Sequence, residues 1–202
     1  AANLKINEWM ADPASGDDDW FELYNSNPNP VALGGCYLTD DLNNRTKTRI
    51  PPLSFIGAGS TNAYLQFQAD GNAGADHVSF SLKASGEAVG ISSPAGVLIN
   101  GVTFGLQQTG VSEGRFPDGS TNIVRFPRTV SPGDPNYLPL TNIVINEALT
   151  HTDPPLEDAI ELRNLTDNDL DISGWWLSDA KGALMKYRIP ENTVVPARGY
   201  TV

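Results

Sequence analysis

The stretch "INEWMADPASGDDDWFELYN", residues 6–25, decides the fold because the chain repeats it as "INEALTHTDPPLEDAIELRN", residues 145–164. Identical residues accumulate without a gap at a single offset of 139 residues. The apolar positions are kept together with the polar ones, so that Leu23 matches Leu162 and Phe21 matches Ile160. A catalytic motif would preserve a few polar residues only, whereas a duplicated scaffold preserves the spacing of its buried side chains. We therefore interpret the repeated phrase as architecture.

Within the repeat, "DWFELYN" and "DAIELRN" alternate apolar and polar residues, which is typical of a strand with one buried face. The pattern predicts that Phe21 and Leu23 are buried and that Glu22 faces the other way. The second copy predicts the same burial for Ile160 and Leu162.

Short apolar runs continue along the chain, and 19 glycines and 15 prolines separate them. Runs such as "AYLQFQ", "HVSFSLK", "AVGISSP", "GVLINGVTF" and "SEGRF" have β character, and "SSPAG" and "PDGS" are typical of turns. Seven to nine short strands at roughly ten-residue spacing indicate an all-β, immunoglobulin-like antiparallel β-sandwich.

The proline-rich stretch "SPGDPNYLPLTN", residues 131–142, cannot continue a strand or helix and separates the two copies. We expect one full domain at residues 1–138, a linker at 139–142, and a second copy at 143–202 that has only the N-terminal half. A half-domain leaves strand edges and an apolar face uncovered, so we expect either that the sequence is a fragment or that another chain supplies the missing half, as in self-association through the second copy.

Composition limits the classes of partner that the chain can have. The chain of 202 residues is 40% hydrophobic and carries a net charge of −11. No apolar run approaches the roughly 18 residues of a membrane helix, so we expect no membrane insertion. A strongly acidic chain repels polyanions, so we expect no nucleic-acid partner.

Several phrases together resemble the lamin tail domain in its bacterial form: "INEWM", "DWFELYN", "LGGCYLTDD", "TRIPP", "VSEGRFPDGS" and "SPGDPNY". The resemblance covers residues 4–137 and recurs over residues 143–202 for the first half only. It implies an immunoglobulin-like β-sandwich without enzymatic activity or catalytic residues. It also implies a bacterial accessory module of secreted or cell-envelope proteins, sometimes beside hydrolases or nucleases.

Glu8 and Glu22 recur as Glu147 and Glu161, and two carboxylates can form an acid–base pair. Because the second copy repeats them without the rest of a site, we interpret all four as structural polar residues. We expect Glu8 or Glu22 to contact Arg115, which would keep the carboxylate charged.

Acidic loops raise the alternative of a calcium site, with Asp17, Asp19 and Asp40 as candidates. No D-x-D-x-D-G loop is present, and we interpret these residues as a solvated acidic loop. We expect no cofactor, with Ca²⁺ as the alternative.

The tryptophans are the best candidates for a binding surface. Trp175 and Trp176 are adjacent, so in a strand they face opposite sides, and Trp9 and Trp20 flank the acidic loop. Exposed aromatic side chains can hold sugars or partner chains, although a packed role is the alternative for each.

The sequence contains little evidence for nucleophilic catalysis. His77 and His151 are the only histidines, Cys36 is the only cysteine, and no G-x-S-x-G elbow is present. We expect the chain to be a non-enzymatic structural, adhesive, or protein- or glycan-binding module of a secreted or cell-envelope protein. The alternative is a non-catalytic appendage of an extracellular hydrolase or nuclease.

Overall fold

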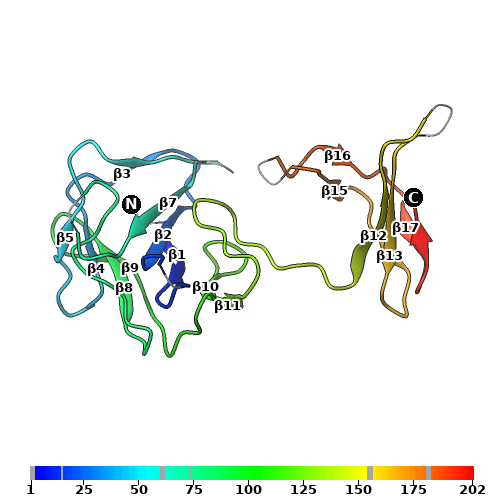
Figure 1. Cartoon of the computed structure of the whole chain (residues 1–202). Helices are drawn as coiled ribbons and strands as arrows, with labels where there is room; N and C mark the ends of the chain where they lie inside the picture. Colours follow the sequence, from blue (N-terminus) through cyan, green and yellow to red (C-terminus); the bar gives the residue numbers. More distant parts are fainter. Residues whose placement is uncertain (1–2, 15, 60–61, 73, 154–156, 181–182) are drawn as a thin grey trace. The chain divides into compact units, whose positions relative to one another are not determined.

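The computed structural model describes residues 3–14, 16–59, 62–72, 74–153, 157–180 and 183–202. Its contacts divide the chain into two compact units, unit 1 at Ala1–Leu138 and unit 2 at Pro139–Val202 (Figure 1). Every regular element in the described residues is a β-strand. The expected immunoglobulin-like all-β fold is confirmed. Among the described residues, no helix has the length and apolar character needed to cross a bilayer.

Unit 1 consists of two antiparallel sheets and a short two-stranded ribbon. The larger sheet has the order β11-β10-β1-β2-β7, the smaller one has the order β5-β4-β8-β9, and β3 pairs with β6. The strands are β1 Leu4–Met10, β2 Trp20–Asn25, β3 Val31–Ala32, β4 Tyr37–Thr39, β5 Thr48–Arg49, β6 Phe55–Ile56, β7 Tyr64–Gln68, β8 Ala88–Ser92, β9 Leu98–Thr103, β10 Ser112–Arg115 and β11 Ile123–Phe126.

The core of unit 1 contains the apolar side chains that the alternating sequence pattern predicts to be buried. Phe21 and Leu23 are fully buried, as expected, and Phe21 stacks on Phe67 and Phe80 at ring-centroid distances of 5.7 and 6.2 Å. Glu22, between them, is fully buried as well. Strand β2 is therefore covered on both faces, with an apolar layer on one side and a polar layer on the other.

A β-bulge at Asn7 determines which residues of β1 face the core. Ile6 pairs with Leu23, but the register then shifts, so that Glu8 pairs with Glu22 and Trp9 pairs with Phe21. In a regular strand Ile6 and Glu8 would point to the same face. The extra residue rotates the strand, which moves the Glu8 side chain away from the apolar layer and Trp9 into it.

The run "HVSFSLK", residues 77–83, is not a strand, and that expectation is wrong. Val78, Phe80 and Leu82 are buried in the alternating manner that the sequence indicates. The backbone, however, forms only isolated bridges, because side-chain oxygens replace a neighbouring strand as acceptors. Ser79 N donates to Thr48 Oγ1 at 3.0 Å, and Leu82 N donates to Asp19 Oδ2 at 2.8 Å.

Unit 2 repeats the first part of unit 1 strand for strand. β12 pairs with β13, β13 pairs with β18, β14 pairs with β17, and β15 pairs with β16. The bulge recurs between Ile145 and Glu147. The strands are β12 Ile143–Leu149, β13 Ala159–Asn164, β14 Leu170–Asp171, β15 Trp176–Leu177, β16 Tyr187–Arg188, β17 Val194–Val195 and β18 Tyr200–Thr201.

The two units also share side-chain hydrogen bonds and glycine conformations in their turns. Asn25 Nδ2 donates to the carbonyl of Asn29 at 3.0 Å, and Asn164 Nδ2 donates to the carbonyl of Asn168 at 2.8 Å. Gly35 and Gly174 both have positive φ, at 84° and 74°, where a side chain is disfavoured. The duplication inferred from the sequence therefore extends to individual hydrogen bonds.

Candidate functional site

Glu8 and Glu22 form a buried carboxyl pair on the polar side of the larger sheet. They are directly opposite each other on β1 and β2, and both are fully buried. Glu8 accepts a hydrogen bond from the Ser112 hydroxyl, while Glu22 accepts from Asn7 Nδ2 at 3.2 Å. The strand register that places Phe21 in the core therefore also places these two carboxyl groups side by side.

The segment at residues 131–136, which we call the strap, covers this pair. Gly133 N donates to Glu22 at 2.6 Å, and Ser131 N donates to Glu8 at 3.3 Å. Asn136 Nδ2 donates to the carbonyls of Arg115 and Asn7 at 2.9 and 3.4 Å. The strap thus seals the carboxyl pair from solvent and connects the C-terminal part of unit 1 to its first two strands.

Asp118 forms a second polar cluster beside the strap, which no motif in the sequence predicted. Its carboxylate accepts hydrogen bonds from Asn7 Nδ2 at 2.9 Å, Tyr64 Oη at 2.7 Å and Asn136 N at 3.1 Å. Burial is the largest cause of the raised pKa of Tyr64, and the hydrogen bond to Asp118 raises it further. The sequence signal was the turn "PDGS", which was interpreted only as a connection between strands.

Burial raises the pKa of both glutamates. Loss of hydration is the largest cause, and it raises the pKa of Glu8 from 4.5 to about 7 and that of Glu22 from 4.5 to about 9. Ser131 Oγ lies 3.1 Å from Glu8 Oε2 and 3.0 Å from Asn136 Oδ1, but a hydroxyl has a single proton to donate. A protonated Glu8 satisfies both contacts by donating to Ser131.

The expected contact of Arg115 with Glu8 or Glu22 is wrong. All three residues are described, and no ion pair joins them. Arg115 Nε instead donates to the carbonyl of Ile6 at 2.7 Å, and Nη1 donates to the carbonyl of Ser120. Burial lowers the pKa of this guanidinium. Arg115 binds backbone oxygens, and burial without a cationic partner raises the pKa of both glutamates, which favours their neutral form.

In unit 2 the matching glutamates lack this environment. Asn146 Nδ2 donates to Glu161 at 2.7 Å, which repeats the contact of Asn7 with Glu22. Glu161 is half-buried, however, and Glu147 is exposed. The local hydrogen bond survives without the cover that buries the pair in unit 1.

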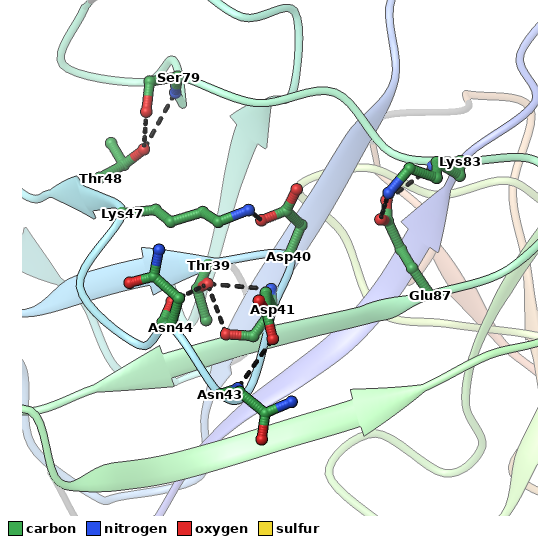
Figure 2. A network of polar contacts seen from close by, with 10 residues as sticks. All are labelled: Thr39, Asp40, Asp41, Asn43, Asn44, Lys47, Thr48, Ser79, Lys83 and Glu87. Atoms are coloured by element: carbon green, nitrogen blue, oxygen red, sulfur yellow. Dashed lines mark hydrogen bonds and ion pairs between the residues drawn. The ribbon is translucent and has the colours of Figure 1, made fainter.

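The candidate calcium ligands are not brought together. Asp40 forms an ion pair with Lys47 in the loop drawn in Figure 2, and unit 2 repeats that pair as Asp179 and Lys186. Asp19 accepts from the backbone of Leu82, and Asp17 is exposed. Within the described ranges, no three histidine, cysteine or acidic side chains gather as a metal site would require.

The tryptophans divide between core and surface. Trp9 and Trp20 are buried, and Trp9 stacks on Phe104 at 5.7 Å, so the expected binding surface at these two residues is wrong. The bulge accounts for Trp9, because it rotates that side chain into the core. Trp175 packs on the small core of unit 2, whereas Trp176 is 44% exposed.

His77 has an acidic partner and Cys36 is buried, whereas His151 is exposed. His77 Nδ1 lies 2.8 Å from Asp70 Oδ2 at the end of β7, and Cys36 is buried in the core. Burial is also the main cause of the raised pKa of the Cys36 thiol, which disfavours the reactive thiolate.

The clearest difference between the units is an uncovered apolar surface in unit 2, which we call the open face: Ile145, Ala148 and Ile160. Ile145 is 60% exposed and Ile160 is 42% exposed, although the matching Ile6 and Phe21 are fully buried. In unit 1 the same surface packs against β8, β9 and the segment that contains Phe80.

Two strand edges accompany the open face. In unit 1, β1 pairs with β10 and β4 pairs with β8. The described part of unit 2 pairs β12 only with β13 and β15 only with β16. An unpaired edge presents a row of backbone donors and acceptors that can receive another strand. The strands that cover this surface and these edges in unit 1 all follow Ala63, the residue that Val202 matches at the offset of 139.

These features define an immunoglobulin-like β-sandwich module whose first strands recur in unit 2. The chain belongs to the lamin tail domain family, because the family model for the Lamin Tail Domain matches residues 1–105 and 139–202. The first match is shorter than the resemblance at residues 4–137, since β10, β11 and the strap lie beyond it. Neither a characterised protein nor a solved structure shows significant similarity.

Proposed function

We propose that the chain is a non-enzymatic structural or adhesive module that binds a protein or glycan partner. The observation that carries the proposal is the environment of the retained carboxyl groups, because Glu8 and Glu22 are sealed inside unit 1 by its own side chains and backbone. The ring of Trp176, which is 44% exposed, is a candidate contact for the partner, since aromatic side chains bind sugars and partner chains.

The carboxyl pair supports a structural rather than a catalytic role. A general acid must come within hydrogen-bond distance of its substrate. Glu8 and Glu22 are fully buried and bound by Ser112, Asn7 and the strap. Their raised pKa values, which in an open cleft would suggest acid–base catalysis, here follow from burial inside a sheet.

Hydrogen–deuterium exchange on the full chain tests whether the carboxyl pair is sealed from solvent. We expect the amides of Ser131 and Gly133 to be protected at neutral pH, because both donate to the buried glutamates. Fast exchange of these two amides would show that the pair is open to solvent, and would contradict the proposal.

The resemblance to bacterial lamin tail domains extends the proposal to a secreted or cell-envelope location. Detection of the natural protein in the external or envelope fraction of its cells tests the location, and exclusive recovery from the cytosol would contradict it.

Glycan binding has one supporting observation, the exposed ring of Trp176, and an oligosaccharide titration of Trp176→Ala tests it.

A further inference from the structure

A cavity of about 320 Å³ in unit 1 is lined by residues of β3, β5 and β6. Ala32, Arg49 and Phe55 line it from these three strands, and Leu53 lines it from the turn between β5 and β6. Every lining residue belongs to unit 1, so the cavity exists without unit 2. Its volume is at the lower end of the range for ligand sites, which suits a ligand of about one amino-acid residue.

Leu53 and Phe55 form an exposed apolar wall of this cavity. Leu53 is 87% exposed and Phe55 is 59% exposed. Leu53 also has a φ of 63°, in the left-handed region that disfavours bulky side chains. Neither burial nor backbone preference explains a leucine at this position. A residue that is unfavourable for the fold and exposed at a cavity is a candidate for ligand contact.

The matching segment of unit 2 has the same backbone conformation and different side chains. Asn192 matches Leu53 and has a φ of 64°, and asparagine is one of the residues that tolerate this conformation best. Asp171 likewise matches Ala32. The apolar side chains at this cavity are therefore specific to unit 1, because the duplicated fold accommodates polar residues at the same positions.

Arg49 gives the cavity a positive charge. Its guanidinium lies beside Gly35, where a Cβ atom would be 3.5 Å from Nη2. Arg188, its match in unit 2, forms an ion pair with Glu191 at 2.8 Å, but Pro52 is at the position of that glutamate in unit 1. No ion pair in the described part of the chain includes Arg49, which is exposed. Arg49 is therefore available to an external anion.

The charge and the apolar wall together indicate the chemistry of the occupant. A guanidinium binds a carboxylate through two parallel hydrogen bonds, and exposed apolar side chains beside an arginine are typical of protein contacts. The C-terminal residue of a polypeptide carries a carboxylate and a side chain on one Cα atom, so a single residue can contact both parts of the cavity. A polyanion is a poor occupant, because the chain has a net charge of −11.

We propose that this cavity binds the C-terminal residue of a partner polypeptide when that residue is apolar. The terminal carboxylate accepts hydrogen bonds from Arg49, and the side chain packs against Leu53 and Phe55. The inference rests on the proposed function, since it gives a protein partner a recognition chemistry and a place in unit 1.

The test is an NMR titration of the isotope-labelled full chain with the peptide Gly-Ser-Gly-Ser-Leu-Phe. We expect the amide signals of Gly34, Gly35 and Phe55 to shift, and those of Ser173 and Gly174 at the matching positions of unit 2 to stay unchanged. The same peptide with a C-terminal amide should bind roughly tenfold more weakly, because it lacks the carboxylate. N-acetylphenylalanine should also bind more weakly, because it lacks the preceding residues that contact the rim of the cavity.

Matched variants of the chain separate binding from folding. Leu53→Asn introduces the residue that unit 2 has at this left-handed position, so we expect it to fold as stably as the native chain and to bind the peptide roughly tenfold more weakly. Arg49→Gln should lose the preference for the free carboxylate over the amide. Leu106→Asn is the control, since Leu106 is 72% exposed and lies outside the cavity, and it should bind normally.

The outcomes separate the inference from the proposed function. Equal affinity for the free acid and the amide would overturn the inference, as would equal shifts in unit 2 or no shift at millimolar peptide. N-acetylphenylalanine binding as tightly as the peptide would indicate a site for small acids and would overturn it too. Protection of the Ser131 and Gly133 amides is measured separately, so the proposed function survives any of these results if those amides are protected.

Discussion

Glu8 and Glu22 link the stability of unit 1 to pH. Their ordinary pKa is 4.5, and burial raises it to about 7 and about 9 in the folded unit. Between pH 4.5 and each raised pKa, the carboxyl group of the folded state holds a proton that the unfolded state has lost. Their contribution to stability is therefore complete below about pH 4.5 and is lost as the pH rises through 7 and then 9.

We predict that the free energy of unfolding of unit 1 falls between pH 5 and pH 9, by on the order of 1 kcal/mol per pH unit for each neutral carboxyl group. Denaturant unfolding of the full chain at several pH values, followed by hydrogen exchange in β1, measures the slope. Glu8→Gln and Glu22→Gln should each flatten it. Glu161 is the half-buried residue of unit 2 that matches Glu22, and Glu161→Gln should leave the slope unchanged. A steep slope in the variant that combines Glu8→Gln with Glu22→Gln would contradict this explanation.

Gly114 is the residue where backbone packing is closest on the β1–β10 pair. We predict that Gly114→Ala destabilises unit 1 by about 1–3 kcal/mol, because the added methyl group must displace the Asn7 carbonyl. Gly105→Ala is the matched control, since a Cβ there meets no atom within 4 Å. Thermal unfolding of both variants measures the difference, and equal effects would argue against steric exclusion at Gly114.

At the scale of elements, the bulged β1–β2 pair and its copy β12–β13 have the same register and different environments. Ile6 and Ile145 occupy the same position in these pairs, so they provide a comparison in which the side chain and the strand position are both constant.

We predict that Ile6→Ala costs unit 1 about 2–5 kcal/mol, the range for a buried large-to-small change. Ile145→Ala should cost unit 2 less than about 1 kcal/mol, because its side chain is already 60% exposed. Denaturant titrations with probes in each unit measure both values. A large loss at Ile145 would mean that the open face is covered in solution.

At the scale of the whole molecule, each unit has a core of its own residues. The core of unit 1 includes twenty buried apolar residues, whereas that of unit 2 includes five: Ile143, Leu162, Ile172, Ile189 and Val195. A small unit with so little buried apolar area is marginally stable by itself.

We therefore predict two calorimetric transitions in the full chain, with unit 2 unfolding at the lower temperature. A single cooperative transition would show that the two units are energetically coupled.

The sequence by itself determined the strand identity of the repeated phrase, the burial of Phe21 and Leu23, and the duplication. These follow from local alternation and from the constant offset of 139 residues, which a linear chain displays directly. The sequence alone could not show that "HVSFSLK" lacks strand pairing. The side chains of Thr48 and Asp19, which accept hydrogen bonds from its backbone, are distant in sequence.

Only the tertiary structure decided the environment of the glutamates and tryptophans. One extra residue at Asn7 reverses the faces of Glu8 and Trp9, and the strap that buries the carboxyl pair lies more than a hundred residues further along the chain. Alternation specifies which side chains share a face. Burial depends on what covers that face, and this is why Ile6 and Ile145, with the same local sequence, have opposite exposure.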